Sequence, residues 1–276
     1  MEIDSHGPID FHTLPEFFFF YFPEEKEKKQ WVTKKEGHRF IFEGVDSLDE
    51  FELSALISLQ NHIEISTQSF EIEMETPQVL RTLQESRFDN KKTIQKLGAT
   101  RTKWENFQPK KPSKVVLDFL SKGLLYVHGF DHRFRPIVVM RLGSVQEEAP
   151  NSFGLLSEAL EYVLDYVVQH MMLGGQIENW VLFVDFENKF IPIEYLSHVF
   201  NFFHTYYPSR AFRYYLLQVS KGWYKLPILR GALSNISENL LILLEGSKTS
   251  KMLEHIHQSQ IDLTALCFYT FNNSLR

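Results

Sequence analysis

The second half of the chain contains short strands without a polar face, and this feature constrains the fold more than any other. Apolar residues follow one another almost without interruption in Trp180–Asp185, Tyr214–Val219 and Leu240–Leu244. A strand with one face in water alternates apolar and polar residues, whereas a strand of a parallel sheet is covered on both faces and does not. The sequence therefore predicts an α/β domain with a mainly parallel sheet flanked by helices.

Amphipathic segments separate these strands. Apolar residues recur at helical spacing before Gly174-Gly175 and again after Pro192. They are Leu155, Leu156, Ala159, Leu160, Val163, Val167 and Met171, and then Ile193, Leu196, Val199, Phe200 and Phe203. A further helix is expected over Trp223–Leu233. Leu124–Val127 and Ile137–Met140 are expected to be neighbouring strands at the start of the same sheet.

Three expected helices form a module ahead of the sheet. The first begins at Ser47, with Glu50 completing a capping box. The second begins at Thr76-Pro77 and the third near Asp89. A linker follows at 108–113. The predicted division is therefore an N-terminal extension, a helical module and a main domain, over residues 1–46, 47–108 and 113–276.

The composition argues against several classes of protein. The longest wholly apolar run, Phe17–Phe22, is far shorter than the ~20 residues that span a bilayer. The single cysteine, Cys267, cannot form an internal disulfide, and the chain does not open on a signal-peptide pattern. We therefore expect a cytoplasmic protein. A net charge of -6 argues against a dedicated nucleic-acid-binding protein.

The N-terminal extension combines the aromatic run Phe17–Phe22 with the charged run Glu24–Lys29. Neither pattern predicts regular structure. We interpret the aromatic run as packing into a groove on its own domain, and two alternatives stay open. The run could instead insert into a membrane surface or bind a protein partner.

No motif predicts catalysis. Gly246–Thr249 lacks the spacing of a phosphate-binding loop, and His255 and His257 diverge around a helix with no further ligand nearby in the sequence. No Gly-x-Ser-x-Gly elbow is present to supply a nucleophile. Asp185, at the end of a strand, is interpreted as a cap of the next turn. We expect no enzymatic activity, no cofactor and no metal.

Several motifs, in this order, resemble those of the CRAL-TRIO lipid-binding family. The sequence VLRTLQESRFD at 79–89, with Trp104 after it, is similar to the N-terminal helical signature of the family. The sequence GFDHRFRP at 129–136 resembles its Gly-x-Asp-x-x-Gly-Arg-Pro turn, with Phe134 in place of the second glycine.

The resemblance continues to about residue 260. Val184-Asp185 is similar to the hydrophobic-Asp pair that ends a family strand, and YYPSR at 206–210 resembles the Tyr-Pro-Glu-Arg corner. The next strand, here 216–219, follows this corner. Trp223–Leu233 then occupies the position of the gate helix, which swings to open the lipid cavity in that family.

The resemblance implies an apolar cavity between the sheet and the gate. Its expected lining is Tyr126, Val138, Met140, Trp180, Leu182, Val184, Phe200, Phe203, Leu216 and Gln218. The gate is expected to present Trp223, Leu226, Leu229 and Leu233. Headgroup or membrane contact is expected at Arg87, Ser209, Lys225, Arg230 and Asn239.

Departures from the family pattern bear on the ligand. Members that bind phosphatidylinositol carry a basic residue, Glu and Lys where this chain has Ser86, Ser209 and Asn239. A phosphate without these partners loses strong charge-assisted interactions, so a phosphoinositide is disfavoured. Trp180 and Leu182 replace the small hydroxyl residues that meet a choline headgroup.

We therefore expect a non-enzymatic protein that binds, and transfers between membranes, a lipid or other hydrophobic small molecule. Its expected partners are that ligand and, transiently, a membrane surface, but not nucleic acid. The alternative is a protein-interaction module that keeps the fold without ligand exchange and binds its partner through the N-terminal extension.

Overall fold

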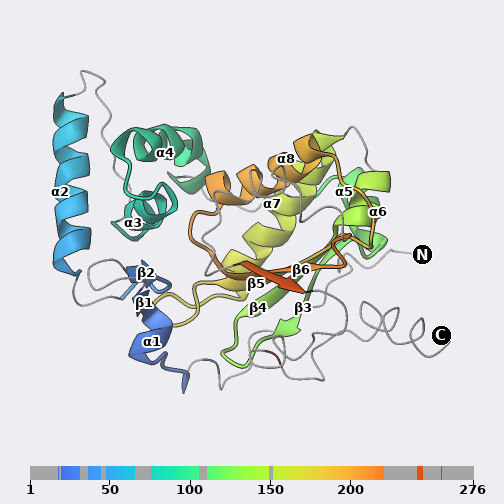
Figure 1. The fold of residues 1–276 in the computed structure, drawn as a ribbon, viewed down its shortest axis with the longest axis horizontal. Coiled ribbons are helices and arrows are strands. Elements are labelled where there is room, and N and C mark those ends of the chain that lie inside the picture. The colour runs from blue at the N-terminus through green and yellow to red at the C-terminus, as the bar shows by residue number, and fades with distance from the viewer. Residues whose placement is uncertain are drawn as a thin grey trace.

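The computed structural model describes residues 18, 20–31, 37–44, 48–65, 76–105, 111–148, 152–220, 241–244 and 256. Its elements, drawn in Figure 1, are α1 (Glu25–Lys28), β1 (Lys29–Trp31), β2 (Gly37–Arg39), α2 (Glu50–Ile65), α3 (Thr76–Glu85), α4 (Asn90–Glu105), α5 (Lys114–Ser121), β3 (Leu125–Phe130), β4 (Pro136–Arg141), α6 (Leu142–Glu148), α7 (Phe153–His170), β5 (Trp180–Asp185), α8 (Ile193–Tyr206), β6 (Ala211–Leu217) and β7 (Leu241–Leu244). None of these helices is long and apolar enough to cross a bilayer.

A five-stranded sheet in the order β3-β4-β5-β6-β7 forms the centre of the main domain. β3 and β4 are antiparallel, and every other neighbouring pair is parallel. The predicted α/β fold with a mainly parallel sheet is therefore confirmed. The β3–β4 turn is held by Asp131, whose carboxylate accepts hydrogen bonds from the backbone nitrogens of Arg133 and Arg135, each at 2.8 Å.

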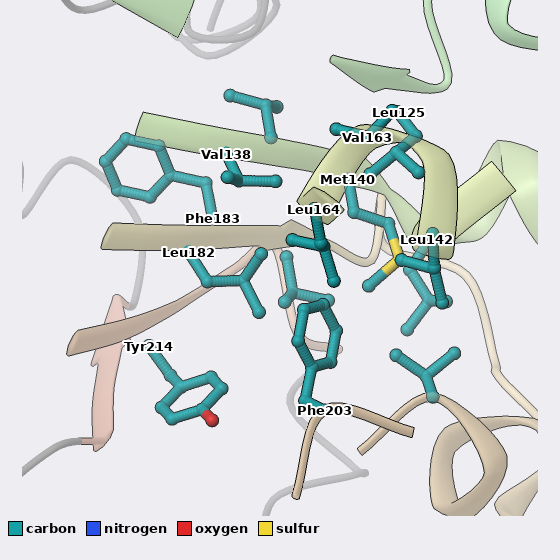
Figure 2. Packing of buried hydrophobic residues seen from close by; sticks show 14 of the residues in the cluster. Leu125, Val138, Met140, Leu142, Val163, Leu164, Leu182, Phe183, Phe203 and Tyr214 are labelled. Carbon is teal, nitrogen blue, oxygen red and sulfur yellow. The ribbon is translucent and has the colours of Figure 1, made fainter. Parts of the chain in front are cut away.

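Helices α7 and α8 cover one face of the sheet (Figure 1). Figure 2 shows Leu164 of α7 and Phe203 of α8 on the same side of the sheet as Leu182 of β5. The neighbouring residue Phe183 points to the other side of the strand. Both residues are buried, so β5 is covered on both faces, as its sequence predicted.

The helices α2, α3 and α4 share a small core of Leu59, Val79, Leu83 and Leu97. The cap of α2 differs from the predicted Ser47/Glu50 pair. Its capping box is formed by Asp49, whose Oδ1 accepts from the Glu52 nitrogen at 2.8 Å, and by Glu52, whose Oε2 accepts from the Asp49 nitrogen at 3.1 Å. Ser47 itself lies outside the described residues.

Several short helices and strands were not predicted from the sequence. The expectation of no regular structure in the N-terminal extension is wrong for α1 and for the antiparallel pair β1–β2. These strands are too short to show a periodic pattern, and contacts distant in sequence hold them. Arg39 of β2, for example, forms an ion pair with Glu52 of α2 at 2.6 Å. The predicted linker likewise ends in the cap of α5, because Ser113 Oγ accepts from the Val116 nitrogen.

A buried carboxylate joins the N-terminal segment and the helical module to the main domain. Glu178, in the loop before β5, accepts hydrogen bonds from the backbone nitrogens of Phe42, Glu43 and Gly175 at 2.8–2.9 Å. It also forms an ion pair with Arg81 of α3, and both side chains are buried. One carboxylate thus holds three separate parts of the chain.

A second polar joint lies between α4 and α7. The ammonium of Lys103 is 2.8 Å from Asp165 and 3.0 Å from Glu161. The hydroxyl of Tyr207 donates to the same Asp165 carboxylate. The helical module therefore meets the main domain through charged groups, while each part keeps its own apolar core.

Replacing Glu178 by Gln should destabilise the protein strongly. The substitution removes the buried charge that faces the Arg81 guanidinium and leaves only the half-exposed Glu43 paired with it at 2.9 Å. Breaking a buried pair costs about 3 kcal/mol or more. Urea unfolding followed by circular dichroism measures this change. Glu147→Gln is the matched control, because Glu147 pairs with Lys189 at an exposed position and should cost less than about 1 kcal/mol. Equal losses in the two variants would contradict the assigned role of Glu178.

Candidate functional site

Six of the sheet residues that were expected to line the cavity face α7 and α8. Strand pairing places Val138 opposite Leu182, and Met140 opposite Val184, which in turn pairs with Leu216. Trp180 lies two residues before Leu182 and shares its face. All six are buried in the main core.

Two further predicted lining residues, Phe200 and Phe203, come from α8 and complete this packing. The ring centroid of Phe200 lies 5.8 Å from that of Tyr214, and the Phe203 ring lies 6.4 Å from Trp180. The structure thus brings eight of the predicted lining residues together in the layer between the sheet and the helices. Their contact with a ligand stays a prediction.

The opposite face of the sheet carries a second apolar row. Val139, Phe183 and Tyr215 are paired across β4, β5 and β6, and Tyr126 of β3 stands opposite Val139. The rings of Phe183 and Tyr215 lie 5.0 Å apart. Of this row, only Tyr126 was among the predicted lining residues. The alternation of side chains along a strand could have pointed to this second row, because Val139 and Phe183 are the sequence neighbours of predicted lining residues.

A polar cluster stands at the carboxyl ends of β4, β5 and β6, the edge at which α/β folds place ligands. The Asp185 carboxylate accepts from the Glu187 nitrogen at 2.8 Å and from Gln218 Nε2 at 3.4 Å. Arg141 pairs with Glu187 at 2.6 Å. The interpretation of Asp185 as a turn cap is confirmed. Gln218, a predicted lining residue, lies at this edge and also accepts from Asn188 Nδ2 at 3.0 Å.

The positions predicted for headgroup contact differ in their surroundings. Ser209 is buried, and its backbone nitrogen donates to Glu85 at 2.8 Å while its hydroxyl donates to the Arg81 carbonyl at 3.1 Å. Ser86, the serine in place of a basic residue, is also buried, whereas Arg87 is exposed. Among the described residues at these positions, Arg87 is the only cation, and it lies on the surface.

The Glu85 carboxylate places a buried negative charge beside Ser209. Burial alone would raise the pKa of Glu85, but the charge and hydrogen bond of His204 and the charge of Lys96 lower it to about 2. His204 Nδ1 and Glu85 are in direct contact. A phosphate at this position would face an ionised carboxylate.

The remaining predicted site residues lie outside the described residues. They are the gate residues Trp223, Leu226, Leu229 and Leu233, and the contact residues Lys225, Arg230 and Asn239. Gly246–Thr249, His255, His257 and Cys267 also lie outside them. Within the part of the chain that the structure describes, no group of side chains has the arrangement of a metal site.

A small pocket lies between α5 and α7, away from the sheet. It has a volume of about 210 Å³, and its walls include Val116, Tyr162 and Asp165. Pockets for drug-sized ligands begin near 300 Å³, so this pocket is too small for a lipid.

Asp185 should make stability depend on pH. Burial is the main cause that raises its pKa from 3.8 to about 6. The folded state therefore binds the proton more tightly than the unfolded state, and this contribution is lost as the pH rises through about 6. At ~1.4 kcal/mol per pKa unit, the loss amounts to roughly 3 kcal/mol.

The Asp185→Asn variant lacks this titration. Its unfolding free energy, relative to the wild type, should rise by roughly 2–3 kcal/mol between about pH 4 and about pH 7. Urea unfolding at the two pH values measures the difference. Asp118→Asn, on the exposed surface of α5, is the control for replacing an aspartate by asparagine. A constant difference for Asp185→Asn would contradict the assignment.

Comparison with known proteins places the chain in a family. Among solved structures, the chain is similar to the crystal structure of Sfh5, with 10% sequence identity and a TM-score of 0.49, over 75% of this chain and 85% of that chain. No curated protein sequence matches it. The family model of the CRAL/TRIO domain matches residues 120–264, which is more than half of the 276 residues. This chain therefore belongs to the CRAL/TRIO domain family, as the motifs of its sequence predicted.

Proposed function

We propose that this protein binds a lipid or other hydrophobic small molecule and carries it between membranes without catalysing a reaction. CRAL/TRIO proteins are in general non-catalytic and bind or transfer such ligands. The observation that carries the proposal is the apolar row of Val139, Phe183 and Tyr215 on the sheet face opposite α7 and α8.

The ligand of this proposal lies against that row. Val139, Phe183 and Tyr215 span three adjacent strands, which gives an apolar surface long enough for part of an acyl or isoprenoid chain. Burial of such a chain is favourable at ~25 cal/mol per Å². The predicted gate, Trp223–Leu233, would then close over the ligand, and Lys225 and Arg230 would meet anionic headgroups at the membrane.

The domain division follows from the same proposal. Residues 113–276 form the ligand-binding domain, and residues 47–108 form a module that the Arg81–Glu178 and Lys103–Asp165 pairs attach to it. Residues 1–46 form the N-terminal extension. The proposed location is the cytoplasm, with transient binding to membranes.

A protein-interaction module without ligand exchange is the second candidate. Its support comes from Ser209, whose hydroxyl and backbone nitrogen are already used in bonds within the protein. Native mass spectrometry of protein purified from a eukaryotic host, followed by organic extraction, separates the two candidates. A bound lipid favours the carrier, and protein without ligand favours the module.

Adjacent valines on β4 test which sheet face meets the ligand. Val139→Phe should reduce the amount of co-purified lipid several-fold, because its larger side chain occupies the proposed cavity. Val138→Phe is the matched control on the helix-packed face, where overpacking should cost about 1–3 kcal/mol of stability and leave the lipid bound per folded molecule unchanged. Organic extraction and urea unfolding measure the two quantities. Loss of lipid only in Val138→Phe would place the ligand on the α7/α8 side instead.

Phosphatidylinositol should be a poor ligand. Its phosphate would find serine at positions 86 and 209 and would face the ionised Glu85, so we expect transfer at least tenfold slower than for phosphatidylcholine. Vesicle-transfer assays with each lipid, with folding checked by circular dichroism, measure this ratio. Faster transfer of phosphatidylinositol would show that other cations, such as Lys225 or Arg230, replace the missing contacts.

A further inference from the structure

The segment before α1 alternates between buried and exposed side chains. Phe18 is 1% exposed and Pro23 is buried, whereas Phe20 and Phe22 are 77% and 75% exposed. Phe20 and Phe22 are only two positions apart, and exposed apolar residues that lie together mark interaction sites more often than single ones do. The sequence prediction that the aromatic run packs on its own domain therefore holds for Phe18 but not for Phe20 or Phe22.

Contacts of the neighbouring residues Phe18 and Tyr21 hold the segment that carries Phe20 and Phe22. The Phe18 ring packs against Phe130 at the end of β3 and Phe134 of the β3–β4 turn, with centroid distances of 4.8 and 4.7 Å. Tyr21 lies 5.3 Å from Phe134, and its hydroxyl donates to Glu27 at 3.0 Å. The two exposed rings thus project from an anchored segment. In Figure 1 this segment lies below α1, on the side of the sheet away from α7 and α8.

The charges beside the exposed rings balance each other. Lys26 pairs with Glu24 and Lys28 pairs with Glu25, each at 2.7 Å. Arg133 of the β3–β4 turn pairs with Glu27 of α1. The paired charges leave little net charge around the two rings, so this surface does not repel a zwitterionic phospholipid headgroup layer and does not steer a charged protein partner.

We propose that Phe20 and Phe22 insert into the interfacial layer of a phospholipid membrane and dock the protein there during ligand exchange. The inference rests on the proposed carrier function and adds a membrane-contact site outside the predicted gate. Two projecting side chains are far fewer than the 20–30 residues that each partner contributes to a stable protein interface. They suffice for weak, reversible insertion at the boundary between headgroups and acyl chains.

Sedimentation with phosphatidylcholine vesicles tests the site. The double variant Phe20→Ser/Phe22→Ser should bind these vesicles at least tenfold more weakly than the wild type, and Phe20→Leu/Phe22→Leu should retain most of the binding. Binding should change little with added salt, because apolar burial drives it. The control is Val115→Ser/Phe190→Ser, which removes two exposed apolar side chains elsewhere and should bind as the wild type does.

Several outcomes overturn the inference. They are unchanged vesicle binding in the serine variant at positions 20 and 22, an equal loss in the control, and a failure of the leucine variant to bind. Co-purified lipid, measured in the same preparations, reports separately on the carrier function. If Phe20→Ser/Phe22→Ser retains its lipid and still binds vesicles fully, the membrane site alone is refuted. If no preparation contains lipid, the carrier function is refuted.

Discussion

The sheet of this protein has no face that tolerates water, and the rest of the structure follows from that constraint. The strands β4, β5 and β6 pair in register, so that the residues level with Leu182 share one face of the sheet and those level with Phe183 share the other. Both faces are apolar. At ~25 cal/mol per Å², exposing a few hundred Å² of either face would cost an energy comparable to the stability of a typical domain. Helices α7 and α8 cover the first face. Val139, Phe183 and Tyr215 on the second face are buried as well, so both faces of the sheet are covered in the described structure.

The outer parts of the chain are attached by a different kind of interaction. Ion pairs with buried members, such as Arg81–Glu178, Arg39–Glu52 and Lys103–Asp165, join the N-terminal segment, the helical module and the main domain. A buried pair contributes little net stability, because desolvation offsets its attraction, but its loss leaves an uncompensated charge. Such pairs penalise every other orientation of the module and thereby fix its position against the sheet.

The sequence was informative where a pattern is local. Period and capping residues were sufficient to predict the strands of the sheet and the helices α7 and α8, and Asp89 does cap α4 by accepting from the Lys92 nitrogen. The choice between the two sheet faces could not be made in this way. When Leu182 and Phe183 are both apolar, alternation shows which residues share a face but not which face the helices cover.

The polar joints could not be predicted for another reason. Arg81 and Glu178 are 97 positions apart, and Phe42 and Glu178 are 136 apart. No spacing rule for helices or strands relates such positions, since only the folded topology brings them together. The same holds for the β1–β2 pair, whose three-residue strands show no period of their own.

Phe134 shows how a departure from the family pattern can be physically consistent. The resemblance places glycine at this position, and the backbone φ of 61° is one that glycine adopts without strain. A bulky residue in this conformation costs of order 1–3 kcal/mol, which surrounding contacts must offset. The Phe134 ring contacts Phe18 and Tyr21, so the side chain that strains the turn is also the one that anchors the N-terminal segment. A glycine at position 134 would relax the turn but would remove the ring that contacts Phe18 and Tyr21. The substitution therefore couples the start of the sheet to the segment that carries the exposed rings.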